Sequence, residues 1–163
     1  MVKNLLGLLK TGQSTSYTTG DDGGLQASNG ILNSLTDSGS GTISSANTGL
    51  VWQKCGDGVN GISCLGTLTT SNYTTASFTC SNLNLSGKSW RLPTLEELNS
   101  LVDLGRSSPA ISPIFTMAGT GTFWTSSPYS RDTSQVWTIS FDRGVSPQPP
   151  KHPPPIHDVL RVP

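Results

Sequence analysis

The stretch GKSWRLPTLEELNSLVD at residues 87–103 carries the clearest helix signature in the chain, and the rest of the fold is organised around it. Thr94 and Glu97 have the T-x-x-E spacing of a capping box, in which each side chain bonds the backbone N–H of the other residue. Pro93 keeps the helix from starting earlier. The pattern therefore predicts a helix that begins at Leu95 and ends at Gly105.

Apolar residues share one face of this predicted helix and also precede it. Upstream, Trp90 and Leu92 alternate with Arg91, as in an extended arm that buries every second side chain. The stretch therefore predicts a buried arm that leads directly into an amphipathic helix. The apolar helix face consists of Leu95, Leu98, Leu101 and Val102.

Two segments before the capped helix also have the pattern of regular structure. Residues 36–52 contain two turn-forming clusters around short apolar alternations, and they predict a hairpin. Residues 73–85 place Ala76, Cys80 and Leu83 at helical spacing. They predict the first of two helices, the capped stretch being the second.

Two segments after the capped helix predict antiparallel strands. Residues 123–126 and 135–141 alternate along their length, with Trp137 and Phe141 on the apolar face, which is expected to point inward. A loop at residues 129–134 is expected to join the two strands.

Four tryptophans are expected to meet in a single interior, because each lies inside an apolar alternation. They are Trp52, Trp90, Trp124 and Trp137. Tyr129 is the better candidate for an exposed ring that stacks on a carbohydrate.

The composition is typical of a loop-rich extracellular protein. Of the 163 residues, 33% are hydrophobic and 12% are charged, and 18 are glycine. The length suits one domain. Ten basic side chains balance ten acidic ones, so no net charge draws the chain to nucleic acid or to an anionic membrane. We therefore expect an extracellular or cell-surface location and no nucleic-acid partner.

Residues 1–33 are predicted to form an N-terminal arm, and residues 34–163 the main domain. The apolar run in MVKNLLGLLK is too short to span a bilayer. It fits either a remnant of an export signal or a helix packed on the surface or on another subunit. The polar, glycine-rich stretch that follows offers Tyr17 and Leu25 as anchors.

The three cysteines leave one thiol over if a disulfide forms. Cys55 and Cys64 bracket the glycine-rich loop GDGVNGIS, and a bridge there would hold a segment that has no core of its own. Cys80 lies on the first predicted helix, where a buried thiol is expected.

Four motifs in order resemble one known family. WRLPTLEEL, the segment TDSGSGTISSANTGLVW at residues 36–52, FWTSSPY at 123–129 and VWTISF at 136–141 are similar to the C-terminal domains of Lcl-type collagen-like adhesins. That family is related to the formylglycine-generating-enzyme branch of C-type-lectin-like folds. The resemblance covers roughly residues 12–162. It implies an α+β, C-type-lectin-like fold, with two helices packed on a small twisted antiparallel sheet with long loops.

The resemblance also implies a binding role on a surface, with a glycan or protein ligand held by loops at residues 128–134 and 143–158. The second loop includes SPQPPKHPPP, which holds six of the eleven prolines and predicts extended polyproline II on the surface. The expected ligand-binding side chains are Tyr129, Arg131, Asp132, Arg143, Ser146, Gln148, Lys151, His152 and His157.

Two further hypotheses concern how this surface is used. Some relatives of the fold are variable proteins of diversity-generating retroelements, and the position of the proline tract fits such a diversified region. Alternatively, the chain is a structural subunit of a surface fibre or trimer, in which the arm and the proline tract pack against neighbouring copies. A homo-oligomer is the partner that this alternative implies.

No catalytic motif or metal-ligand cluster stands out in the sequence. The two histidines lie in or beside the proline tract, and the late redox cysteines of formylglycine-generating enzymes have no counterpart after Cys80. We therefore expect no enzyme activity, no metal site and no cofactor. The acidic, glycine-rich turns at residues 21–24, 37–41 and 57–58 offer oxygen ligands for calcium, although ordinary turn chemistry explains them as well.

Overall fold

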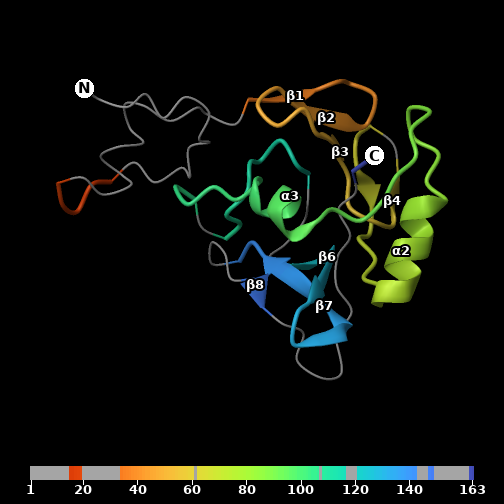
Figure 1. Ribbon diagram of the computed structural model, residues 1–163. Helices are drawn as coiled ribbons and strands as arrows, with labels where there is room; N and C mark the ends of the chain where they lie inside the picture. The colour runs from red at the N-terminus through yellow and green to blue at the C-terminus, as the bar shows by residue number, and fades with distance from the viewer. Residues whose placement is uncertain are drawn as a thin grey trace.

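The computed structural model describes residues 15–19, 34–60, 62–106, 108–116, 121–142, 147–148 and 162–163, with backbone alone for residues 60, 147 and 148. This part of the chain contains two short helices and three small antiparallel sheets (Figure 1). The elements are β1 Leu35–Asp37, β2 Thr42–Ser45, β3 Val51–Gln53, β4 Val59–Asn60, β5 Leu65–Gly66, α2 Tyr73–Ser81, α3 Leu95–Asn99, β6 Thr122–Tyr129, β7 Asp132–Ser140 and β8 Pro147–Gln148. The α+β class is therefore confirmed, with three separate sheets where a single sheet was expected.

The first sheet is a meander of β1, β2 and β3. The turn between β1 and β2 contains Gly39 and Gly41, which both have positive φ. Ile43 pairs with Trp52 across β2 and β3, and both side chains are fully buried. The predicted hairpin is thus confirmed, and β1 adds a third strand at its edge.

The helix α3 begins where the capping box places it. The Thr94 side chain accepts from the Glu97 N–H, and the Glu97 carboxylate accepts from the Thr94 N–H. The predicted end at Gly105 is wrong, since α3 ends at Asn99. After Asn99 the backbone tightens into i→i−3 hydrogen bonds, and Val102 then leaves the helical path to bridge Ile111.

The helix α2 begins at Tyr73 with Asn72 as its N-cap, as the 73–85 pattern requires. It ends at Ser81 rather than at residue 85, because the Asn82 side chain and backbone both bond to the Phe78 carbonyl and close the last turn. Ala76 and Cys80 face inward as predicted. The Cys80 thiol is buried and is not in a disulfide.

The strands β6 and β7 bury side chains on both faces. Phe123 pairs with Ile139 on one face, and Trp124 pairs with Thr138 on the other. The first core lies between this sheet, α3 and the β1–β3 sheet, and it consists of Ile43, Trp52, Leu98, Leu101, Ile111, Phe115, Phe123, Ile139, Phe141 and Val162. The second core lies under α2 and consists of Ala76, Cys80, Leu92 and Trp124.

These two cores correct the prediction of a single interior for the tryptophans. Trp52 lies in the first core and Trp124 in the second, because the alternation of β6 sends neighbouring side chains to opposite faces. Trp90 is buried with its Nε1 donating to the Leu85 carbonyl at 3.0 Å. Trp137 is only half-buried and belongs to neither core.

The arm around Trp90 is tied to the far end of the chain. Arg91 and Val162 exchange two backbone hydrogen bonds of 2.7 and 3.0 Å, and the Val162 side chain is fully buried. The Tyr17 side chain is 83% exposed, so it is not the buried anchor that was predicted for the N-terminal arm. Leu25 and most of the predicted arm lie outside the described residues.

Candidate functional site

The described part of the predicted ligand face is the end of the β6–β7 hairpin. Tyr129 is paired with Asp132, so only Ser130 and Arg131 form the turn. The expected loop at residues 129–134 is therefore wrong, because both strands run on almost to the tip. The pairing is regular from Thr122 to Trp124, and the register then shifts on both sides of Pro128 before Tyr129 pairs with Asp132.

Asp132 holds the start of β7 in place. Its Oδ1 accepts from the Ser134 N–H at 3.1 Å and from the Ser134 hydroxyl at 2.6 Å, and its Oδ2 accepts from the Gln135 Nε2 at 2.7 Å. A carboxylate with these local bonds stabilises the turn. The sequence placed Asp132 correctly at the hairpin tip, but the structure shows it bonded to its own strand.

Tyr129 and Trp137 form an aromatic pair at this end of the sheet. Their ring centroids are 5.1 Å apart, the ring planes are 87° to each other, and both side chains are half-buried. This edge-to-face arrangement is favourable and fixes both rings. The prediction that Trp137 faces the interior is wrong. Along this face of β7 the first core includes Ile139 but not Trp137, which is two residues nearer to the turn.

The backbone of Trp137 is held from the neighbouring strand. The Thr125 hydroxyl, which is fully buried, donates to the Trp137 carbonyl at 2.8 Å. Arg131 in the turn is exposed, and among the described residues it makes no ion pair. The hairpin tip thus combines a fixed aromatic pair with an exposed guanidinium group.

The remaining predicted ligand residues lie largely outside this description. Gln148 is described through its backbone only, which pairs with Thr138 as part of β8. This pairing places β8 beside β7 (Figure 1). The other predicted side chains lie outside the described residues, and they are Arg143, Ser146, Lys151, His152 and His157.

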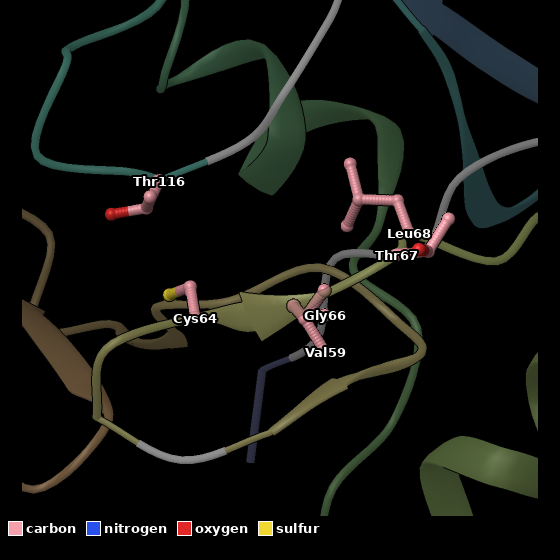
Figure 2. Close-up of a pocket in the computed structure, with 6 residues that line it drawn as sticks. All are labelled: Val59, Cys64, Gly66, Thr67, Leu68 and Thr116. Atoms are coloured by element: carbon pink, nitrogen blue, oxygen red, sulfur yellow. The ribbon is translucent and has the colours of Figure 1, made fainter.

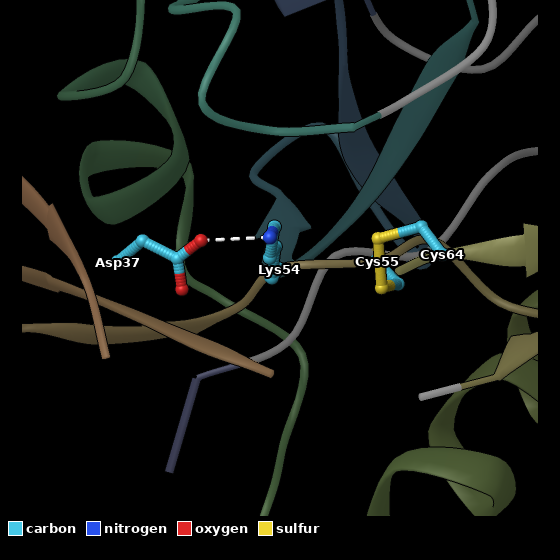
Figure 3. The surroundings of a disulfide bond; sticks show 4 residues. All are labelled: Asp37, Lys54, Cys55 and Cys64. Carbon is cyan, nitrogen blue, oxygen red and sulfur yellow. Dashed lines mark ion pairs between the residues drawn. A yellow bond between two sulfur atoms is a disulfide. The ribbon is translucent and has the colours of Figure 1, made fainter. Parts of the chain in front are cut away.

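In the turn at residues 37–41, one of the calcium candidates, the Asp37 carboxylate forms an ion pair with Lys54. The Lys54 Nζ lies 2.7 Å from the Asp37 Oδ2, and the Gly39 N–H donates to the Asp37 Oδ1 (Figure 3). The hydrogen bond from Lys54, together with that from Gly39, holds the pKa of Asp37 below its ordinary value. Across the described residues, no three His, Cys, Asp or Glu side chains come together as metal ligands, and residues 21–24 lie outside the description.

The predicted disulfide between Cys55 and Cys64 is confirmed, with a Cα–Cα distance of 5.2 Å (Figure 3). Beside it lies a pocket of about 340 Å³ that sequence reasoning missed (Figure 2). Only the glycine-rich loop between the two cysteines hinted at a close approach of chain segments. The pocket is lined by Val59, Cys64, Gly66, Thr67, Leu68 and Thr116.

The structure defines a disulfide-clamped α+β domain that presents a fixed aromatic pair at a hairpin tip. The chain belongs to the Lcl C-terminal domain family, whose sequence model matches residues 41–155. The match includes α3 with its capping box and the β6–β7 hairpin. No curated protein and no solved structure matches the chain. The C-type-lectin-like arrangement and the link to formylglycine-generating enzymes therefore remain predictions.

No helix in the described residues has the length and apolarity needed to cross a membrane.

Proposed function

We propose that this chain is a surface-displayed, non-catalytic recognition domain of the adhesin class, and that it binds an acidic glycan through the tip of the β6–β7 hairpin. Membership of the Lcl C-terminal domain family supports the surface and adhesion role. The balanced charge and low hydrophobic content of the chain suit the same setting.

The observation that carries the proposal is the half-buried Tyr129–Trp137 pair at the end of a hairpin whose turn contains the exposed Arg131, two residues after Tyr129. Tyrosine and tryptophan offer large, rigid apolar faces together with a polar group, which suits the C–H face and hydroxyls of a sugar ring. Arginine presents a planar fork of donors that matches a carboxylate or sulfate group. The three side chains together therefore suit a sugar that carries a negative charge.

The proposed site is also preorganised. The far end of the hairpin is buried on both faces at residues 123–125 and 138–139, Thr125 holds the Trp137 carbonyl, and Asp132 bonds to Ser134 and Gln135 after the turn. A ligand therefore has few protein side chains to order when it binds, which lowers the entropic cost of association.

The proposed role is one of binding without chemistry. Five carboxylates have described contacts that serve the fold: Asp37 pairs with Lys54 and Glu97 with Arg91, while Asp103, Asp132 and Asp142 accept hydrogen bonds from nearby backbone or side-chain donors. A carboxylate committed in this way is a poor general base, because its charged form is already stabilised.

Retroelement diversification of residues 146–155 remains a hypothesis about the same face. Its support is that β8, which is the start of the proline tract, lies next to β7. A template repeat and a reverse-transcriptase gene beside this one are the expected genomic signs. A neighbourhood that lacks both would remove the hypothesis and leave the hairpin site as proposed.

A glycan array with matched variants tests the binding role. We expect the wild-type domain to bind carboxylated or sulfated glycans, and Trp137→Ala, Tyr129→Ala and Arg131→Ala each to weaken binding about tenfold or more. Phe78→Ala is the aromatic control, because Phe78 is 68% exposed on α2, a different element. Arg106→Ala is the charge control, since Arg106 is exposed in another loop.

Two results would contradict the proposed site. One is binding that survives all three hairpin substitutions. The other is an equal loss in the Phe78 and Arg106 controls. Urea unfolding of each variant shows whether a loss of binding reflects a loss of folded protein.

A further inference from the structure

The strand β6 contains a bulge next to the aromatic pair of the hairpin. Between Trp124 and Pro128, β6 has three residues, whereas β7 has only Trp137 between the partners of those two residues. We call residues 125–127 the β6 bulge. A bulge changes which side chains lie opposite each other, and bulges are common beside functional sites.

The β6 bulge brings the two aromatic rings together. If the register of the first three pairs continued unchanged, Tyr129 would face Thr133, four residues from Trp137 and about 13 Å away along the strand. With the bulge, Pro128 faces Val136 instead. The two aromatic residues, one on either side of that pair, are then diagonal neighbours on one face, where large side chains can touch. Their ring centroids are 5.1 Å apart, as this arrangement requires.

The Thr125 hydroxyl closes the β6 bulge. It accepts from the Ser127 N–H at 3.3 Å and donates to the Trp137 carbonyl at 2.8 Å, so it links the two strands where their regular pairing is interrupted. Thr125 is fully buried, which shields these hydrogen bonds from competing water. Without the hydroxyl, the Ser127 N–H and the Trp137 carbonyl would both lose this partner.

The start of α3 holds the β6 bulge from outside the hairpin. The Ser126 N–H donates to the Pro93 carbonyl at 2.7 Å, and the Ser127 Oγ accepts from the Leu95 N–H at 2.9 Å. Leu95 is the first residue of α3, so its N–H has no acceptor within the helix. The bulge therefore supplies an acceptor to the helix, and the helix fixes the position of the bulge.

We propose that Thr125 is a positioning residue of the hairpin site, because its hydroxyl closes the bulge that places Tyr129 beside Trp137. Ser126 and Ser127 anchor the same bulge on α3. The effect on binding rests on the proposed recognition of an acidic glycan, whereas the effect on the aromatic pair does not. Separate measurements therefore test the two effects.

NMR tests the effect on the aromatic pair, because ring protons this close give nuclear Overhauser contacts. Thr125→Val removes the hydroxyl and retains the shape of the side chain, and we expect it to lose the Tyr129–Trp137 contacts. Thr125→Ser restores the hydroxyl and is expected to restore the contacts. Thr42→Val is the matched control, since Thr42 is also buried but lies in another sheet, where its hydroxyl bonds to Ser38.

Binding is measured with a chondroitin sulfate tetrasaccharide, which carries both carboxylate and sulfate groups. We expect Thr125→Val to bind it about tenfold more weakly than the wild type, because the displaced rings must be ordered again on binding. Thr42→Val is expected to bind it like the wild type. A wild-type domain that binds no tetrasaccharide counts against the proposed function, and the NMR contacts still decide the role of Thr125.

Ser127→Ala decides the question if Thr125→Val does not fold. It removes the acceptor of the Leu95 N–H, and we expect weaker contacts between the aromatic rings and an affinity about threefold lower. Ser100→Ala is its control, since Ser100 is half-buried at the other end of α3 and donates to the Glu97 carbonyl. Urea unfolding shows which variants are folded.

The inference is overturned if the contacts between the two rings persist in Thr125→Val or, where that variant does not fold, in Ser127→Ala. It is also overturned if Thr42→Val or Ser100→Ala loses the contacts to the same extent, because a general loosening of the domain would then be the cause. Failure of Thr125→Ser to restore the contacts has the same consequence, since the hydroxyl would not be the group that matters.

Discussion

Arg91 and Glu97 form a two-point ion pair, with Arg91 Nη2 at 2.7 Å from Glu97 Oε1 and Arg91 Nη1 at 2.8 Å from Glu97 Oε2. The same Oε2 accepts from the Thr94 N–H at 2.7 Å. One carboxylate therefore caps α3 and holds the arm that pairs with Val162. The motif WRLPTLEEL therefore joins three parts of the chain: the arm at Arg91, the start of α3 at Thr94 and Glu97, and the segment at Val162. We call this contact the Glu97 junction.

Substitutions at Glu97 separate its two roles. Glu97→Gln keeps an acceptor for the capping box but removes the charge, and we expect a loss of about 0.5–1 kcal/mol, since Arg91 is half-exposed and solvent screens the pair. Glu97→Ala removes both roles and is expected to cost about 1–2 kcal/mol. Urea unfolding measures both. Glu96→Ala, at an exposed position of the same turn, is the control, and an equal loss there would contradict the junction.

The stability of the domain should fall in acid through the same carboxylate. The hydrogen bonds from Arg91 hold the pKa of Glu97 below its ordinary value of 4.5, although burial opposes this. A depressed folded pKa contributes stability above the unfolded value, and this contribution is lost as the pH falls through the folded pKa. We expect little change between about pH 7 and pH 5.5 and a decline below about pH 4.5. Glu97→Gln should flatten that decline in part, because the pKa of Asp37 is lowered too.

Val162 should matter for stability although it lies next to the final residue. Its side chain is fully buried in the first core, and its backbone makes both hydrogen bonds of the bridge to Arg91. Val162→Ala is expected to cost about 2 kcal/mol through lost burial and the remaining cavity. Val51→Ala is the control, since Val51 is only half-buried in β3. Thermal unfolding that ranks the control below Val162→Ala in stability would contradict this role.

Much of the local structure could be predicted from the sequence, because its causes are local. The start of α3 follows from Thr94 and Glu97, and the disulfide follows from two cysteines around a loop with no core. The end of α3 could not be predicted, because Val102 leaves the helix to pair with Ile111, a contact made by the tertiary fold. Propensity alone would have continued the helix.

Only part of the candidate site could be predicted from the sequence, for a similar reason. Tyr129 and Arg131 could be placed at a turn by the residues around them. Trp137 has the same alternation as the buried Ile139, so periodicity assigns both to the core. Only the three-dimensional extent of the first core shows that it ends before Trp137. The pocket beside the disulfide joins residues far apart in sequence, and the glycine-rich disulfide loop is the one local pattern that hinted at it.

The disulfide should contribute to stability through the loop it closes. Cys55 and Cys64 are nine residues apart, and the entropy of closing so short a loop corresponds to roughly 2–3 kcal/mol. We expect the double variant Cys55→Ser and Cys64→Ser to unfold at a correspondingly lower urea concentration. Reduction of the wild type should give the same shift. Reduction should leave the urea midpoint of the double variant unchanged, and a further shift there would mean that the disulfide is not the cause.

Trp52 and Trp124 are both fully buried, but only the Trp124 Nε1 has a described hydrogen bond. This difference predicts that replacement by phenylalanine costs more stability at Trp124 than at Trp52. The Trp124 Nε1 donates to the Ser71 carbonyl at 2.8 Å and so ties β6 to the segment before α2. The Trp52 Nε1 is buried without a hydrogen-bond partner among the described residues. A buried donor left unpaired costs about 1–3 kcal/mol, so its removal offsets part of the lost packing. We expect Trp124→Phe to destabilise the domain by about 1–3 kcal/mol more than Trp52→Phe, measured by urea unfolding. Both substitutions remove the same atoms from a fully buried site, so each serves as the control for the other. A larger loss for Trp52→Phe would mean that its indole nitrogen has a partner in the folded protein.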